Sequence, residues 1–192
     1  MTTHAIFNRP LDGPVPQGLD QAIFGMGCYW GVERLFWQQN GVWLTQVGFA
    51  GGTVENPTYD QVKSGTTGHA EVVRIVYDSS KISYDHLLKL FWENHDPTQG
   101  DRQGNDAGPQ YRSLIMAFTD SQMSAAEASR IDYDNRLAVA GFGKITTQII
   151  GPAPFWPAHD AHQQYLEKNP DGYCGLKGTG VEASLPNPDP IP

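Results

Sequence analysis

The sequence predicts an α+β or mixed α/β sandwich. Strand and helix patterns are interspersed along the chain, and the connections between them differ in length, which disfavours a regular doubly wound sheet. A length of 192 residues favours one domain, and 39% hydrophobic with 18% charged residues is enough to bury a core. We therefore expect one domain, with an irregular arm over residues 1–20, a core over 21–170 and a flexible, Gly- and Pro-rich tail over 171–192.

The first part of the core is predicted to hold two strands separated by a helix. Residues 21–24 form a short apolar run typical of a strand, and apolar residues then recur at helical spacing over 29–39. An Asn-Gly pair ends this helix, after which 41–49 predicts a second strand. Residues 51–68 are rich in turn-forming types, so we expect a long loop, the kind of segment that often carries function.

The middle of the core repeats this order. Residues 69–78 show the clearest strand pattern, because side chains of one parity are apolar after the first position. Ser83 can cap the next helix, and Pro97 stops it. A polar loop is expected over 98–110, followed by a strand over 112–118.

The last part of the core is predicted to contain two more helices. Thr119 with Gln122 has the pattern of a capping box in front of a helix over 120–140. Residues 145–150 predict a strand, and 158–168 a final helix that an Asn-Pro pair ends. The remainder is expected to be irregular.

Charge and the character of the apolar segments exclude several classes of function. Lys and Arg number 13 against 21 Asp and Glu, for a net charge of −8, so the chain lacks the clustered cations that nucleic-acid binding needs. No basic leader with an apolar stretch opens the sequence, and no segment approaches the length of a membrane span. We expect a cytoplasmic monomer that binds neither nucleic acid nor membrane.

The two cysteines are too few for a disulfide scaffold, so each is expected to be a thiol with chemistry or a plain packing residue. Cys28 lies where a strand hands over to a helix, and the unpaired N–H groups and dipole of a helix start stabilise a thiolate. Gly27 and Gly31 allow close backbone approach beside it, while Tyr29 and Trp30 would form the wall of an apolar pocket.

Glu71 is the candidate acid. It starts the apolar parity of its strand, so we expect its carboxyl on the same face as Val73 and Ile75 and at least partly buried. Burial raises the pKa of a carboxyl, and an acid that stays protonated near neutral pH can donate a proton to a substrate oxygen. The alternative is a glutamate at the strand end that turns into solvent.

Further candidate residues lie in loops. Tyr59 and Tyr111 stand in or beside Gly- and Pro-rich loops, where a phenol can donate to a ligand oxygen or simply pack. Asp106 can hold its own loop through side-chain to backbone bonds, or orient a water. Cys174 is expected on an irregular segment, because glycine and proline dominate from residue 172 onward.

Several alternatives stay open on these residues alone. A G-x-G pair at residues 25–27 resembles the start of a dinucleotide-binding loop, but the third glycine is misplaced. His159 and His162, at i and i+3 of the predicted last helix, lack the partners of a metal site, so no metal is predicted. An activated Cys28 would also suit a thiol hydrolase or acyltransferase with His69 or His162 as base. A non-enzymatic module with an aromatic binding patch is the remaining alternative.

Four motifs follow one another along the chain. They are Gly25-Met-Gly-Cys28-Tyr-Trp-Gly-Val-Glu33, Gly68-His-Ala-Glu71-Val-Val, Asn105-Asp-Ala-Gly-Pro-Gln-Tyr-Arg112 and Gly172-Tyr-Cys174-Gly. Together they resemble the A-type peptide methionine sulfoxide reductases from about Ala22 to Gly175. Tyr29 departs from the family pattern, which usually has Phe there. Cys174 is the single cysteine near the C-terminus, where some members have two.

The resemblance implies a two-layer α+β sandwich around a mixed, mainly antiparallel sheet with flanking helices and an irregular C-terminal segment. It implies that the S epimer of methionine sulfoxide is reduced, free or in oxidised proteins, as a repair reaction. No bound cofactor is implied, and thioredoxin or another dithiol is the implied reductant.

The same resemblance implies roles for individual residues. Cys28 would be the nucleophile that becomes a sulfenic acid, and Glu71 the acid that protonates the oxygen. Cys174 would be the resolving thiol that condenses with Cys28 to a disulfide. The implied substrate-binding residues are Tyr29, Trp30, Tyr59, Asp106 and Tyr111.

Overall fold

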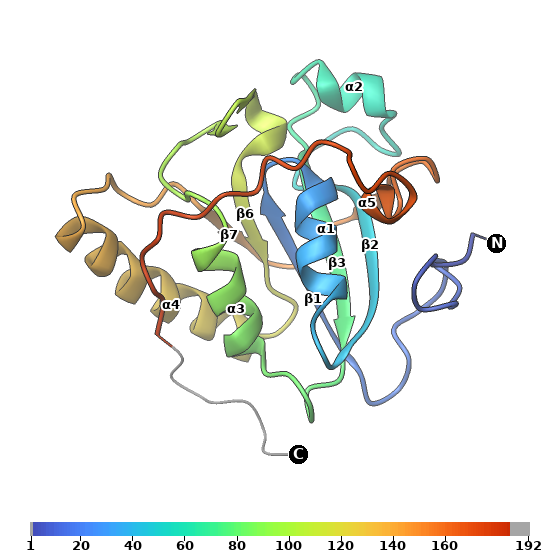
Figure 1. The fold of residues 1–192 in the computed structure, drawn as a ribbon, viewed down its shortest axis with the longest axis horizontal. Helices are drawn as coiled ribbons and strands as arrows, with labels where there is room; N and C mark the ends of the chain where they lie inside the picture. The colour runs from blue at the N-terminus through green and yellow to red at the C-terminus, as the bar shows by residue number, and fades with distance from the viewer. Residues whose placement is uncertain (1, 185–192) are drawn as a thin grey trace.

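A six-stranded sheet forms the centre of the computed structural model, which describes residues 2–184 (Figure 1). The strands are β1 (Asp20–Met26), β2 (Val42–Ala50), β3 (Ala70–Tyr77), β6 (Ser113–Met116), β7 (Gln148–Ile150) and β8 (Phe155–Pro157). Their order across the sheet is β7-β6-β1-β3-β2-β8, and every pair is antiparallel except β6 with β7. The expectation of a mixed, mainly antiparallel sheet is confirmed.

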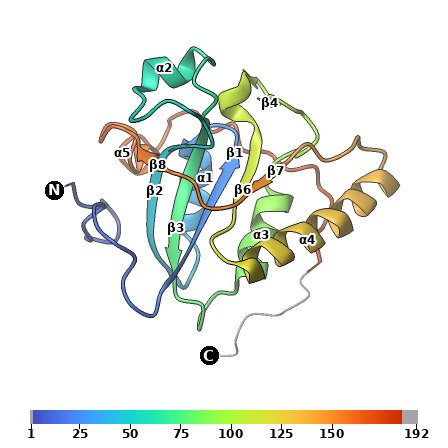
Figure 2. The same ribbon diagram turned by 180° about the vertical axis from the view of Figure 1, so that it is seen from behind.

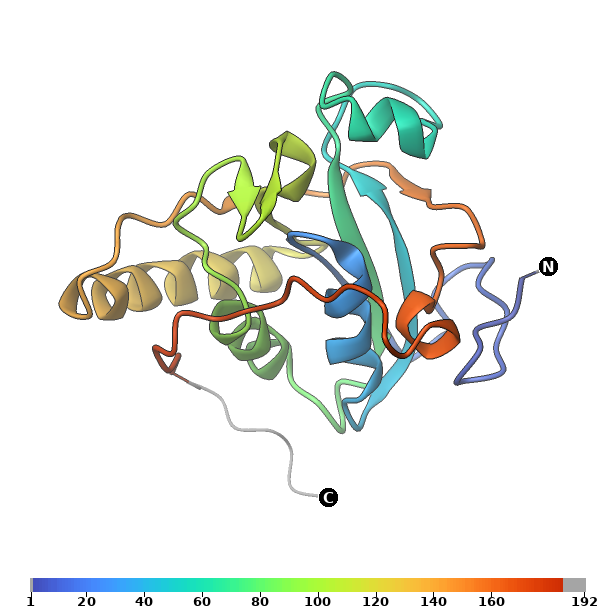
Figure 3. The same cartoon turned by 45° about the horizontal axis from the view of Figure 1, so that its top comes forward.

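Helices cover one face of this sheet. The helices are α1 (Tyr29–Trp37), α2 (Tyr59–Lys63), α3 (Tyr84–Glu93), α4 (Asp120–Val139) and α5 (Tyr165–Lys168), with a 3₁₀ turn at Pro109–Tyr111. Buried side chains of α1, α3 and α4 share one apolar core with β1 and β3, and Figure 3 shows α1 lying along the strands. None of the helices in the described part of the chain has the length and apolar character needed to cross a membrane.

Irregular chain covers the opposite face. Figure 2 shows the segment between β7 and β8 crossing the strands, where Ala153 and Phe155 pack against a second cluster that includes Ile23, Val72 and Leu114. The N-terminal arm adds Leu11 to a third cluster on the same sheet. With helices on one side and these segments on the other, β1 and β3 are buried on both faces.

Capping groups fix two helix starts as expected. The Ser83 hydroxyl accepts from the His86 backbone N–H, and the Thr119 hydroxyl accepts from the Gln122 N–H. The reciprocal half of the box at Thr119 is shifted by one residue, because the Gln122 side chain accepts from the Phe118 N–H. Each contact satisfies a donor that a helix start leaves unpaired.

Three predicted segments need correction. The final helix over 158–168 is wrong, since only α5 is helical there. The reason is a set of long-range bonds: the Gln163 side chain pairs with the N–H and C=O of Val47 as a strand would, and Gln164 adopts a left-handed φ of 47°. The two predicted loops also contain structure, α2 in one and a short hairpin of β4 (Arg102–Gln103) and β5 (Asp106–Ala107) in the other.

The C-terminal segment returns across the helix layer. After α5 it passes over the first turn of α1 and runs toward α3 and α4 (Figures 1 and 3). Residues 171–184 have no helix or strand, which agrees with the predicted irregular tail. The rest of the predicted flexible tail, 185–192, lies outside the described residues.

Candidate active site

Cys28 is the N-cap residue of α1, follows β1 after the single residue Gly27, and is half-buried. The turn into it requires glycine, since Gly27 has a φ of +92° and a Cβ there would lie 2.7 Å from the Gln103 side chain. Burial, together with the charge of Glu71, raises the pKa of the Cys28 thiol, whereas a hydrogen bond from the Trp30 N–H lowers it. The expected thiolate stabilisation by the helix start is present in that bond, but burial outweighs it.

Glu71 lies beside Cys28. Its Oε2 accepts the backbone N–H of Tyr29 at 3.2 Å, and the residue, which pairs across the sheet with Phe49, is only 4% exposed. The predicted burial is confirmed, and the alternative of a solvent-facing glutamate is wrong. Burial raises the pKa of the Glu71 carboxyl to about 8. A protonated Glu71 also removes the negative charge that raises the pKa of Cys28.

Tyr59 and Tyr111 lie near Glu71 and Cys28, and they come from two different segments of the chain. Tyr59 begins α2 and Tyr111 ends the 3₁₀ turn, and both are half-buried. Burial raises the pKa of each phenol, and the charges of Glu71 and Cys28 raise it further. The two hydroxyls therefore remain protonated and able to donate at neutral pH.

Aromatic rings form one wall of the site. Trp30 stacks on Tyr165 with ring centroids 3.9 Å apart, and its Nε1 donates to His162 Nδ1 at 3.3 Å. His162 stacks in turn on Tyr59 at 4.5 Å. Sequence reasoning did not find Tyr165, because its contact with Trp30 is not visible in any local pattern. Since His159 and His162 lie in turns before α5, their expected helical spacing is wrong.

Tyr29 lies beneath this wall and is 1% exposed. Its ring centroid is 6.0 Å from that of Phe49 and 5.7 Å from that of His162. Among the residues that the structure describes, no group makes a hydrogen bond with the Tyr29 hydroxyl. The hydroxyl that distinguishes this residue from Phe is thus buried beside the site without a protein partner.

Cys174 reaches the site from the C-terminal segment. It is an exposed free thiol, and its Sγ would lie 2.6 Å from a Cβ placed on Gly31, in the first turn of α1. The Tyr173 hydroxyl donates to Asp106 Oδ2 at 2.9 Å, which fixes this segment beside β5. Asp106 is expected to hold its own loop through side-chain to backbone bonds. In the structure its side chain instead bonds to the C-terminal segment. The last motif contains Tyr173, but the sequence does not indicate its contact with Asp106, because the two residues are far apart in the chain.

The geometry argues against a cysteine hydrolase. Both ring nitrogens of His69 are bonded to the backbone of the preceding loop, since Nδ1 accepts from the Gly52 N–H and Nε2 donates to the Val54 carbonyl. Neither nitrogen is therefore available as a base for Cys28. His162, the other candidate base, accepts the Trp30 indole N–H at its Nδ1, and its ring stacks on Tyr59 as part of the aromatic wall. The glycines of the possible dinucleotide-binding loop are instead packed against protein atoms, Gly27 against Gln103 and Gly31 against Cys174.

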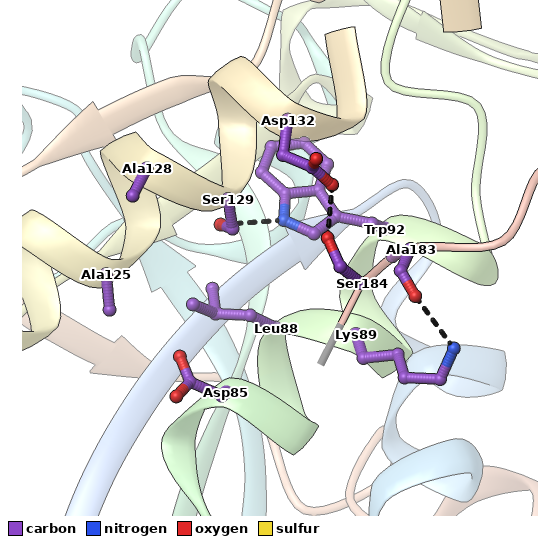
Figure 4. Close-up of a pocket in the computed structure, with 10 residues that line it drawn as sticks. All are labelled: Asp85, Leu88, Lys89, Trp92, Ala125, Ala128, Ser129, Asp132, Ala183 and Ser184. Carbon is purple, nitrogen blue, oxygen red and sulfur yellow. Dashed lines mark hydrogen bonds between the residues drawn. The ribbon is translucent and has the colours of Figure 1, made fainter. Parts of the chain in front are cut away.

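A separate cavity of about 390 Å³ lies between α3, α4 and the C-terminal segment (Figure 4). The Trp92 indole donates to Ser129 at its side, and Lys89 donates to the Ala183 carbonyl. Neither cysteine nor Glu71 lines this cavity, so it plays no part in the site around Cys28.

Comparisons with known proteins agree on one family. A family model described as peptide methionine sulfoxide reductase matches residues 20–186. The chain is 59% identical over 183 residues to the peptide methionine sulfoxide reductase MsrA of Rhodospirillum centenum, covering 95% of this chain and 84% of that protein. Methionine sulfoxide reductase A of Corynebacterium diphtheriae superposes with a TM-score of 0.82 at 44% identity, covering 96% of this chain and 89% of that one.

The structure of Saccharomyces cerevisiae Mxr1 in complex with Trx2 has the same fold. It superposes with a TM-score of 0.53 at 20% identity and covers 91% of this chain and 95% of that one.

Proposed function

The chain belongs to the peptide methionine sulfoxide reductase family, and from this premise we propose how its own residues reduce methionine S-sulfoxide. Cys28 is the nucleophile, Glu71 the proton donor and Cys174 the resolving thiol. The observation that carries this assignment is the bond from the Tyr29 N–H to Glu71, which holds a buried acid at the helix start where Cys28 lies.

In the first step the Cys28 sulfur attacks the sulfoxide while Glu71 donates a proton to its oxygen. Methionine leaves after a two-electron reduction, and Cys28 keeps the oxygen as a sulfenic acid. The proton released by the Cys28 thiol replaces the one that Glu71 gives, so the acid is restored. A carboxyl with a pKa near 8 is protonated at neutral pH and suits this role.

Tyr59 and Tyr111 bind the sulfoxide oxygen beside Glu71. Their protonated phenols supply donors to an oxygen whose negative charge grows as the S–O bond breaks. Tyr29 and Trp30 hold the methyl group, and Trp30 is kept in place by its stacking on Tyr165. Asp106 positions the segment that carries Cys174 through its bond to Tyr173.

In the second step the Cys174 thiol attacks the sulfur of the sulfenic acid. A Cys28–Cys174 disulfide forms, and the oxygen leaves as water. Support for this step is the contact of Cys174 with Gly31, three residues after Cys28 and on the same side of the helix.

In the third step thioredoxin reduces the disulfide through its own dithiol. An exposed Cys174 gives such a dithiol a sulfur to attack. The proposed compartment is the cytoplasm, since two cysteines that must return to thiols after every turnover fit a reducing environment. No bound cofactor takes part in these steps.

The proposal is tested by steady-state turnover with thioredoxin and separately supplied S and R epimers of methionine sulfoxide. We expect turnover of the S epimer by the wild type and none by Cys28→Ser. Activity that survives in Cys28→Ser, or turnover that needs no reductant, contradicts the proposal.

A further inference from the structure

Glu33 is a buried acid on the inner side of α1, and its carboxyl accepts hydrogen bonds from two other segments of the chain. Glu33 is 0% exposed. Its Oε2 accepts the Gln164 backbone N–H at 2.7 Å, and its Oε1 accepts the Gln164 side-chain amide at 2.7 Å and the Thr45 hydroxyl at 3.1 Å. One acid thus joins α1, β2 and the residue that precedes α5.

The N-terminal arm completes this cluster. His4, also 0% exposed, accepts the N–H groups of Ile6 and Phe7 at Nδ1, so its proton lies on Nε2. Nε2 then donates to the Thr45 hydroxyl at 2.9 Å, which leaves the hydroxyl hydrogen for Glu33. The Ala5 N–H also donates to the Gln164 side-chain oxygen at 3.2 Å.

The cluster holds an unfavourable backbone in place. Gln164 has a φ of 47°, a left-handed conformation that a residue with a Cβ rarely adopts without support. Its backbone N–H and both ends of its side chain are bonded, to Glu33 and to the arm. The next residue is Tyr165, whose ring stacks on Trp30 at an interplanar angle of 14°.

We propose that Glu33 is a positioning residue for the substrate site, and that the N-terminal arm, through His4 and Thr45, completes its anchor on Gln164. The arm lies before residue 20, where the family match begins, yet it fixes the ring that supports Trp30. The inference rests on the proposed function, since it takes Trp30 as part of the sulfoxide-binding wall. On this proposal, the N-terminal arm contributes to substrate binding although it contains neither cysteine.

A matched pair at Thr45 tests the hydrogen bonds directly. Thr45→Val keeps the shape of the side chain but removes the hydroxyl, whereas Thr45→Ser keeps the hydroxyl. KM and kcat for methionine S-sulfoxide would be measured with saturating thioredoxin. We expect Thr45→Val to raise KM about tenfold with little change in kcat, as for the loss of ~1.4 kcal/mol in substrate binding. Thr45→Ser should restore the wild-type KM.

A second pair keeps the test valid if Thr45→Val fails to fold. His4→Ala removes the link from the arm, whereas Arg9→Ala removes another arm contact, the Arg9 guanidinium that donates to the Trp43 carbonyl and lies over its ring. We expect KM to rise in His4→Ala and to stay unchanged in Arg9→Ala, with thermal denaturation recorded for both.

The outcomes are distinguishable. An unchanged KM in Thr45→Val and His4→Ala, even with lower melting temperatures, would show a merely structural cluster and overturn the inference. An equal rise in KM in His4→Ala and Arg9→Ala would also overturn it, since docking of the arm in general would then be the cause. A wild type that does not reduce methionine sulfoxide would instead overturn the proposed function itself.

Discussion

The sulfur of Cys174 lies against Gly31, so close that a methyl group on Gly31 would come within 2.6 Å of it. Gly31 belongs to the first turn of the helix that Cys28 caps. The absence of a side chain at position 31 therefore lets the second thiol approach the first along the helix surface. In the proposed mechanism, formation of the Cys28–Cys174 disulfide therefore depends on the small size of Gly31.

We expect Gly31→Ala to slow formation of the disulfide while sparing the first round of reduction. The added methyl displaces the end of a side chain on an irregular, exposed segment, so the melting temperature should change little. Rapid mixing with S-sulfoxide, followed by trapping of sulfenic acid, would measure the step. An unaltered rate of disulfide formation would show that the contact with Gly31 does not guide Cys174.

Glu71→Gln tests the acid through its pH dependence. Because the pKa of Glu71 is raised to about 8, the single-turnover rate of the wild type should fall as the pH rises through that value and the acid loses its proton. The variant should react roughly 10²–10⁴-fold more slowly near neutral pH, the usual contribution of a positioned acid, and should lack this inflection. The same inflection in both proteins would assign it to another group.

Glu71 also predicts a pH-dependent stability. A carboxyl whose pKa is raised on folding, here from 4.5 to about 8, stabilises the folded state fully below the lower value. That contribution is lost as the pH rises through the upper value. The free energy of unfolding of the wild type, relative to Glu71→Gln, should therefore decline over this range. Chemical denaturation at several pH values checks it, and a constant difference would mean that burial does not disfavour the charge.

Comparing the wild type with Glu71→Gln separates the effect of Glu71 on the free energy of unfolding from the effects of other buried titratable groups. Burial also raises the pKa of Glu33, to about 7, and lowers that of His95 to about 4. Both proteins share these residues, so their effects cancel in the difference.

Tyr29→Phe should raise stability. The hydroxyl is buried and has no hydrogen-bond partner among the described residues, so its removal should increase the free energy of unfolding by roughly 1 kcal/mol or more. Tyr84→Phe is a matched control, because the Tyr84 hydroxyl on α3 is likewise buried and unpaired within the described chain. Denaturant titration measures both. A loss of stability confined to Tyr29→Phe would reveal a partner for this hydroxyl.

Local patterns predicted the parts of the site that depend on local structure. The strand-to-helix turn placed Cys28 at a helix start, and strand alternation placed Glu71 on the face of β3 that Val73 and Ile75 share and the helices cover. The stacking of Tyr165 on Trp30 and the bond from Tyr173 to Asp106 join residues far apart in the chain, so no spacing rule could find them.

The error in the last helix has the same origin. The sequence predicts a helix over 158–168 that an Asn-Pro pair ends, but Gln163 and Gln164 are bonded to β2 and α1 instead. These tertiary bonds outweigh local propensity and open the chain into turns. The strand β8 was missed for a related reason, because a three-residue strand at a sheet edge has too few positions for alternation to be recognised.

The central claim is that Cys28 and Cys174 act in sequence on one sulfoxide, and one experiment without reductant tests it. The reduced wild type and Cys174→Ser would each be mixed with resolved epimers, and released methionine, intact mass and disulfide pairing measured. We predict about one equivalent of methionine per chain from the S epimer only, with a Cys28–Cys174 bond in the wild type and a sulfenic acid in the variant. No methionine from either epimer, or methionine without that bond in the wild type, would contradict the account.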